Sequence, residues 1–132
     1  MSADGSVITR MYEALGRGDV DAALACLTDD ARVWHSFDGA AHDRAAVRGQ
    51  WEATVAAFPE QALADVRREP IAGGFVQRHV WTVRSAAGER KAWPCCIFVR
   101  IEDGLIARLD EYIDRAGSFE PPESGPVVTP GL

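Results

Sequence analysis

The apolar residues of this 132-residue chain change their spacing near residue 60, and this change limits the folds that the chain can adopt. Upstream of that point, most apolar residues recur every three or four positions, as in a helix that buries one face. Downstream they alternate with polar residues, as in a strand that buries one face. Helices followed by consecutive strands predict an α+β fold, in which three helices pack on one face of a curved and mainly antiparallel sheet.

Three helices are predicted in the first half of the chain. The first covers residues 6–15 and is followed by glycines. The second is short: Asp19 is a typical N-cap, and the apolar pattern runs as far as Leu27. The third follows Asp43, another typical N-cap, and ends at residue 58, just before a proline.

Five strands are predicted from short runs of alternating apolar residues. One precedes the third helix, and the other four follow it without interruption. The five predicted strands cover residues 31–37, 62–70, 75–85, 90–102 and 105–114. Turn residues separate the last four, and Asp103-Gly104 is a strong hairpin signal because both residues tolerate a positive φ. These four strands are therefore expected to form an antiparallel meander.

The C-terminal segment differs in composition from the rest of the chain. Four prolines between residues 117 and 132 exclude both a helix and a central strand. We therefore expect one domain over residues 1–116, followed by a mobile, proline-rich tail over residues 117–132.

Charge and hydropathy exclude some kinds of partner. The formal net charge is −6, so the chain lacks the basic surface on which phosphate backbones and anionic membranes bind. It has no apolar run near the roughly 20 residues that a membrane-spanning helix needs, and its first ten residues do not resemble a leader peptide. We expect no nucleic-acid partner, no membrane partner and a cytoplasmic location.

Each of three predicted strands places one ionisable side chain among the apolar residues of one face. These side chains are His35, His79 and Glu111. A buried carboxylate without a partner costs several kcal/mol, so Glu111 should be paired, solvated or protonated. For any one of them alone, a structural role in the core is the alternative interpretation. The three together favour a small-molecule pocket on the concave face of the sheet.

Other residues on this face are expected to contact a small apolar molecule. They are Phe75, Gln77, Trp81, Trp93, Cys95, Val99 and Leu109, with Asp38 at the end of the first strand. Asp38 precedes a glycine, so a turn residue is the more typical interpretation than an orienting partner of His35.

A metal site is not predicted. His35, His79 and Glu111 could supply two imidazoles and one carboxylate, but such sites usually include two ligands close in sequence, and these three lie on separate strands. His42 falls in a polar connection where we expect it to face solvent. The three cysteines lack a zinc-binding spacing and are expected to be reduced thiols. We therefore expect neither a metal nor an organic cofactor.

The opposite face of the sheet also carries large apolar residues. They are Trp34, Val80, Phe98 and Tyr112, and they alternate with arginines. A face of this composition is typical of a subunit interface, and a homodimer is the simplest assembly that would cover it.

Several segments resemble the nuclear transport factor 2-like superfamily, in its polyketide-cyclase-like (SnoaL-like) branch. The resemblance extends over roughly residues 5–115, and it rests on residues 12–15, 18–21, 29–35, 102–106 and 110–114. It implies a cone-shaped α+β fold. It does not identify one reaction, because this scaffold serves several chemistries.

The steroid isomerases of this superfamily have a catalytic aspartate near the end of the first strand, and His35 resembles its counterpart. Met11 and Ile97 (or Cys96) stand where those enzymes place their oxyanion-binding tyrosine and acid. Tyr12 follows Met11, but one helical step turns it about 100° away.

The epoxide hydrolases of the superfamily have a carboxylate on the last strand, which Glu111 resembles. Their arginine–aspartate pair is absent, because Val80 and Thr82, or with a small shift His79 and Trp81, occupy the matching positions.

The sequence therefore suggests cofactor-independent proton transfer on an apolar substrate that carries a carbonyl or an epoxide. In this hypothesis His35 is the general base, Glu111 is its orienting partner or the complementary acid, and His79 donates a hydrogen bond to developing negative charge. Isomerisation, cyclisation and epoxide hydration all remain open. The alternative is a non-catalytic module that binds a lipophilic ligand or supports a dimer.

Overall fold

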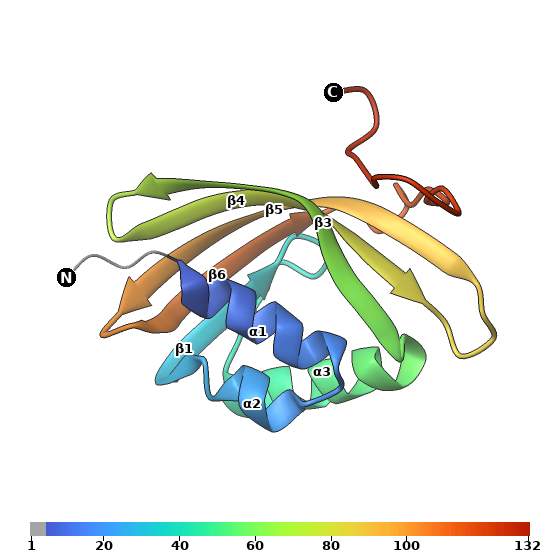
Figure 1. Cartoon of the computed structure of the whole chain (residues 1–132). Helices are drawn as coiled ribbons and strands as arrows, with labels where there is room; N and C mark the ends of the chain where they lie inside the picture. Colours follow the sequence, from blue (N-terminus) through green and yellow to red (C-terminus); the bar gives the residue numbers. More distant parts are fainter. Residues whose placement is uncertain (1–4) are drawn as a thin grey trace.

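The computed structural model describes residues 5–132; residues 1–4, which begin the domain predicted over residues 1–116, lie outside the described residues. One six-stranded sheet of order β2-β1-β6-β5-β4-β3 curves around the helices, as Figure 1 shows. The elements are α1 (Ser6–Gly16), α2 (Val20–Leu24), β1 (Leu27–His35), β2 (Ala40–His42), α3 (Arg44–Ala57), β3 (Glu60–Ile71), β4 (Gly74–Arg84), β5 (Arg90–Glu102) and β6 (Leu105–Ile113). The predicted α+β class is confirmed.

The helix starts follow the predicted caps. The side chains of Asp19 and Asp43 accept hydrogen bonds from backbone N–H groups three residues later, at 3.0 Å each. The second helix ends at Leu24, so its predicted extension to Leu27 was wrong. Leu27 instead begins β1 and pairs with Ile106 of β6. This pairing between strands overrides the local helical pattern. None of the described helices is both long and apolar enough to cross a membrane.

The four consecutive strands form the predicted meander. Each of the pairs β3·β4, β4·β5 and β5·β6 is antiparallel. The last strand then pairs in parallel with β1, which brings the two ends of the domain together in one sheet. The short strand β2, which the sequence analysis missed, pairs with the end of β1. Its three residues are too few to show an alternating pattern.

The buried apolar side chains form two clusters on the concave face. The larger, which we call the main core, packs α1 and α3 against the sheet and includes Met11, Trp51, Phe75, Val99 and Leu109. The smaller, which we call the aromatic cluster, contains Val83, Trp93 and Cys95, with the partly buried Phe58, Trp81 and Ile113 around them. The helices thus cover only part of the concave face.

The C-terminal tail returns to the sheet and contacts it at two places. Phe119 exchanges two backbone hydrogen bonds with Ala92, at 2.8 and 2.9 Å, and the Arg90 guanidinium donates to carbonyl groups of the tail at 3.0 and 2.7 Å. Farther along, the carboxylate of Asp65 accepts hydrogen bonds from the backbone N–H and the hydroxyl of Thr129, both at 2.9 Å. The predicted mobility of residues 117–132 stays a prediction, and these are the contacts that such motion would break.

The outer face of the sheet keeps part of the predicted apolar surface. Phe98 and Tyr112 are 43% and 48% exposed, and the Tyr112 ring contacts both Phe98 and Trp34. Val80 is fully buried, so its predicted place in an exposed patch was wrong. The candidate interface therefore consists of the three aromatic residues.

Candidate functional site

The strand register aligns one row of polar side chains across the concave face. His35 lies opposite Glu111, Glu111 opposite Ile97, Ile97 opposite Gln77, and Gln77 opposite Arg68. Residues directly opposite each other in a sheet point to the same face, so this alignment puts the polar members of four strands on one side. We call Arg68, Gln77, Glu111 and His35 the polar row. The row lies between the main core and the aromatic cluster.

His35 and Glu111 form the closest ionisable pair of the polar row. The His35 Nε2 and Glu111 Oε1 atoms are 3.7 Å apart, too far for a direct hydrogen bond. Burial raises the pKa of Glu111 to about 7. Burial also lowers the pKa of His35, although the nearby Asp38 carboxylate opposes this change. Burial therefore shifts both groups toward their neutral forms, which are a carboxylic acid for Glu111 and an unprotonated imidazole for His35.

Hydrogen bonds along the polar row fix the tautomer of His79. The Arg68 guanidinium, which can only donate, gives a hydrogen bond of 2.8 Å to Gln77 Oε1. The Gln77 amide nitrogen must then donate to His79 Nδ1, at 3.0 Å. Nδ1 is thus an acceptor, and the proton of the neutral ring lies on Nε2.

The Nε2–H group of His79 is a donor without a protein acceptor. His79 is fully buried, and its Nε2 has no hydrogen-bond partner in the described part of the chain. Burial, followed by the positive charge of Arg68, lowers the pKa of His79 to about 4. The ring therefore stays neutral near pH 7 and offers one N–H group. The predicted role of His79 as a donor is compatible with this arrangement.

Tyr12 is a residue of this site that the sequence analysis missed. Its ring meets the edge of the His79 ring, with 5.3 Å between the ring centroids. Burial raises the pKa of the Tyr12 phenol well above its usual value, and the nearby Glu111 and Cys95 raise it further. The step of about 100° from Met11 thus turns Tyr12 toward His79 on β4. This is possible because the sheet curves around α1, as Figure 1 shows. The sequence signal that could have indicated Tyr12 is its position as an aromatic residue directly beside the buried apolar face of the first helix.

Asp38 and His42 lie next to His35 at the edge of the sheet. One Asp38 oxygen accepts a hydrogen bond from the Ala40 N–H at 3.0 Å, which is the predicted turn role. The other oxygen is 2.8 Å from His42 Nε2. His42 belongs to β2 and is only half-buried, and its imidazole is paired rather than facing solvent alone. The His35 ring stacks on Phe37, with 4.7 Å between the centroids.

The predicted apolar contact residues are divided between the two clusters. Phe75, Val99 and Leu109 belong to the main core, where they pack beneath the helices. Trp81 and Trp93 stack in the aromatic cluster at 5.1 Å, close to Cys95. The aromatic cluster is the less covered of the two, so it has the better access to a ligand. Substrate contact by any of these residues stays a prediction.

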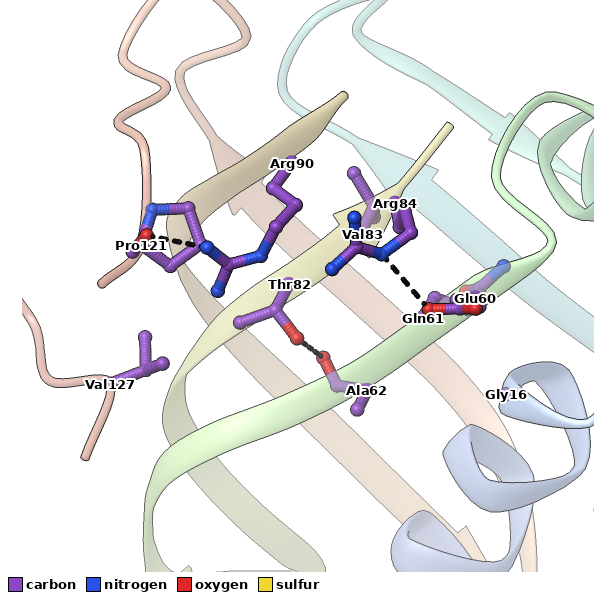
Figure 2. Close-up of a pocket in the computed structure, with 10 residues that line it drawn as sticks. All are labelled: Gly16, Glu60, Gln61, Ala62, Thr82, Val83, Arg84, Arg90, Pro121 and Val127. Carbon is purple, nitrogen blue, oxygen red and sulfur yellow. Dashed lines mark hydrogen bonds and ion pairs between the residues drawn. The ribbon is translucent and has the colours of Figure 1, made fainter. Parts of the chain in front are cut away.

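An open cavity of about 290 Å³ lies elsewhere, between β3, β4 and the C-terminal tail. Figure 2 shows its lining, which includes Gln61, Thr82 and Arg84 but none of the residues predicted to act on a substrate. Its charged groups are paired: Arg84 lies 3.2 Å from Glu60, and Arg90 donates to the carbonyl oxygen of Pro121. This cavity is therefore separate from the polar row.

Three solved structures illustrate what the fold is similar to. A candidate polyketide cyclase from Xanthomonas campestris pv. campestris is 24% identical, with a TM-score of 0.70 over 83% of this chain and 88% of that chain. A candidate polyketide cyclase from Pseudomonas putida KT2440 is 21% identical, with a TM-score of 0.74 over 89% and 96%. An LEH-like epoxide hydrolase from M. tuberculosis is 14% identical, with a TM-score of 0.71 over 86% and 84%. At these identities the likeness establishes the fold alone.

A sequence family model gives a more direct assignment. The model of the SnoaL-like domain matches residues 8–109, which include most of α1, all of the main core except Val7, and three of the four residues of the polar row. No curated protein sequence matches the chain. The match extends over most of the chain and agrees with the resemblance inferred from the sequence, so the chain belongs to the SnoaL-like family of the nuclear transport factor 2-like superfamily.

Proposed function

We propose that this protein is a small-molecule enzyme that transfers protons on an apolar substrate carrying a carbonyl or an epoxide. The observation that carries the proposal is the convergence of His35, Glu111, Tyr12 and His79 beside one row of the concave face. They come from four different elements, so only the fold brings them together. Structures of similar fold include candidate polyketide cyclases and an epoxide hydrolase, which supports the reaction class at the family level.

Each of the four side chains has a distinct role in the proposed reaction. The unprotonated His35 takes a proton from an acidic C–H group, or from a water molecule that attacks an epoxide. Glu111, in its acid form, gives a proton to the oxygen that gains negative charge. The hydroxyl of Tyr12 and the Nε2–H of His79 stabilise that oxygen by hydrogen bonding. Glu111 and His35 then exchange one proton, across their 3.7 Å gap or through a water molecule, which restores the starting state.

The aromatic cluster favours a substrate with few polar groups. Trp81 and Trp93 present stacked rings, and both indole N–H groups already donate to protein acceptors, Gln61 and the Arg115 carbonyl oxygen. The cluster therefore offers contact area without free hydrogen-bond donors from these rings. A flat, largely apolar molecule suits such a surface better than a charged one.

Deuterium exchange tests proton transfer without knowledge of the product. A panel of apolar ketones and β-keto esters is incubated with the protein in D₂O and a chelator, and NMR records the loss of α-protons. We expect Glu111→Gln to slow exchange by about 10²- to 10⁴-fold, the usual contribution of a general acid or base. Asp110→Asn is the matched control, since Asp110 neighbours Glu111 on β6 but pairs with Arg108 instead. A parallel panel of apolar epoxides tests hydration.

The rival function is a module that binds a lipophilic ligand without turnover. Binding of an apolar fluorescent probe separates the two functions. If the probe binds and neither panel reacts, or if Glu111→Gln and Asp110→Asn react equally, the enzymatic proposal is wrong. Unchanged probe affinity together with lost exchange in Glu111→Gln supports it.

We also propose that the protein acts as a homodimer in the cytoplasm. The exposed Phe98 and Tyr112 and the adjoining Trp34 form a contiguous aromatic surface on the outer face. Aromatic side chains of this kind are enriched in subunit interfaces. The site itself faces the other side of the sheet, so a partner on the outer face would leave it accessible.

A further inference from the structure

A second group of side chains lies at the edge of the concave face and shares only His35 with the proton-transfer residues named above. His35, Asp38 and His42 each offer one ligand atom, and these atoms all lie within 4.8 Å of one another. The β1–β2 pairing explains this proximity. His42 lies opposite Val33, so it shares a face with His35 and is its diagonal neighbour. Asp38 stands in the turn between the two strands.

The unpaired nitrogen of His35 is an independent indication of a ligand. His35 is only 9% exposed, yet its Nδ1 has no hydrogen-bond partner within the described residues. A buried polar atom without a partner costs about 1–3 kcal/mol, so such atoms call for an explanation. The other ring nitrogen, Nε2, is the one nearest Glu111. Nδ1 therefore remains available to bind a ligand.

The surroundings of the cluster match the outer shell of a metal site. A histidine that binds a metal commonly directs its second ring nitrogen at a carboxylate, which orients the ring. Glu111 stands 3.7 Å from His35 Nε2 in that position. The Asp38 carboxylate is likewise oriented, because the Ala40 N–H holds one of its oxygens.

We propose that His35, Asp38 and His42 form a binding site for a divalent first-row transition ion, with Zn²⁺ as the expected occupant. Two imidazoles and one carboxylate suit these ions, whereas Mg²⁺ and Ca²⁺ prefer oxygen ligands alone. With metal–ligand bonds of about 2.0 Å, tetrahedral ligand atoms lie about 3.3 Å apart. The observed separations, 2.8 Å for Asp38–His42 and at most 4.8 Å for the rest, bracket this value. Small side-chain rotations would complete the site.

Three protein ligands leave at least one coordination position open. A site with an open position can bind water or a substrate oxygen, as catalytic zinc sites do. The site shares the concave face with Glu111, so a substrate oxygen on the ion would lie near the polar row. Asp38 and His42 are partly exposed, with 31% and 23% of their side-chain surfaces accessible, and this provides a route for the ion. This inference goes beyond the proposed proton transfer, which requires no ion. With an ion on Nδ1, the Nε2 atom of His35 carries the ring proton and cannot accept another, so the ion-bound and the proton-transferring forms are different states of the site.

Direct titration with Zn²⁺ tests the site. The full chain is treated with a chelator, exchanged into metal-free buffer and titrated by calorimetry, and Co²⁺ absorption spectra report the coordination number. We expect one Zn²⁺ per chain, a raised melting temperature and a four- or five-coordinate Co²⁺ spectrum. Outer-shell changes alone typically weaken metal binding 10- to 100-fold, so His42→Ala and Asp38→Asn should each weaken it by at least about 100-fold. Both side chains are partly exposed, so these variants are expected to fold.

Two matched controls exclude other binding modes. Asp110→Asn removes a carboxylate that lies on the other face of the sheet and pairs with Arg108, and Cys96→Ser removes the most accessible thiol that could capture zinc. Both should retain full affinity. The proposal fails if no saturable binding occurs at one ion per chain, or if His42→Ala and Asp38→Asn bind as tightly as the parent. Because the deuterium-exchange assay contains a chelator, its result stands independently of this one.

Discussion

The main core and the aromatic cluster arise from the same strand alternation but differ in what covers them. Leu109 and Ile113 illustrate this: both point to the concave face of β6, four residues apart. Leu109 packs beneath the helices and is 3% exposed, whereas Ile113 joins the aromatic cluster and is only partly buried. A strand pattern therefore specifies which side chains face inward. The helices decide which of them become solid core and which can meet a ligand.

The polar row lies where these two regions meet, and its position accounts for its chemistry. Glu111 and His79 are close enough to the main core to lose most of their hydration, which favours their neutral forms. They also adjoin the aromatic cluster, where a substrate has the better access. An ionisable group deeper in the main core would be out of reach of a substrate. A group exposed to solvent would keep its ordinary pKa.

The largest expected difference between the two regions is in stability. Leu109→Ala should lower the free energy of unfolding by about 2–5 kcal/mol, because the helices above Leu109 prevent the cavity from collapsing. Ile113→Ala removes a side chain of the same size on the same strand and should cost about 1 kcal/mol, since Ile113 is partly exposed. Urea denaturation of both variants measures the difference. Equal losses would mean that the aromatic cluster is as tightly packed as the main core.

A second expected effect concerns the pH dependence of stability at the boundary. The pKa of His79 is about 4 in the folded protein, below its unfolded value of 6.5. As the pH falls from 6.5 toward 4, His79 binds a proton in the unfolded chain but not in the folded protein. The free energy of unfolding therefore decreases, by at most about 3 kcal/mol. His79→Gln should remove this decrease. Denaturation at pH 7, 6, 5 and 4 measures the difference between the two proteins.

Glu111 changes the free energy of unfolding with pH in the opposite direction, but this does not affect the comparison of the parent with His79→Gln. Its pKa of about 7 lies above the unfolded value of 4.5, so its share of stability is lost as the pH rises between these values. It is present in both proteins and cancels in their difference. If the free energy of unfolding changes with pH in the same way in the parent and in His79→Gln, the neutral, buried state assigned to His79 is wrong.

The smallest expected effect on folding concerns the outer face. Tyr112→Arg should convert the proposed homodimer into monomers, because it places a charge in the aromatic surface. The unfolding free energy of the monomer should change little, since Tyr112 is 48% exposed and contributes to neither inner cluster. Light scattering after size-exclusion chromatography measures the mass. Val128→Arg, on the exposed tail, is the control and should leave the mass unchanged.

Much of the fold could be predicted because its signals are local. The caps Asp19 and Asp43, the Asp103-Gly104 turn and the strand alternation each depend on a few neighbouring residues. The strand β2 was missed because its three residues are too few to show an alternating pattern. The boundary at Leu27 was misplaced because pairing with β6, far along the chain, decided it. Pairings between segments far apart in the chain leave no local pattern.

The candidate site was predictable only in part, for a related reason. Strand parity placed His35, Gln77 and Glu111 on one face, and the register agrees. The approach of Tyr12 to His79 depends on how α1 crosses the sheet, which its own sequence does not define. The proximity of His42 to His35 likewise depends on a strand of three residues.

The amino-acid sequence by itself determined the α+β class, the order of helices and strands, and which side chains face inward, because these follow from short-range periodicity and turn chemistry. The tertiary structure decided which inward-facing residues become packed core, which nitrogen of His79 carries the proton, and which histidines lie together at the sheet edge. These features depend on how strands and helices lie against one another in space, and they are fixed only when burial and hydrogen bonding are satisfied throughout the fold.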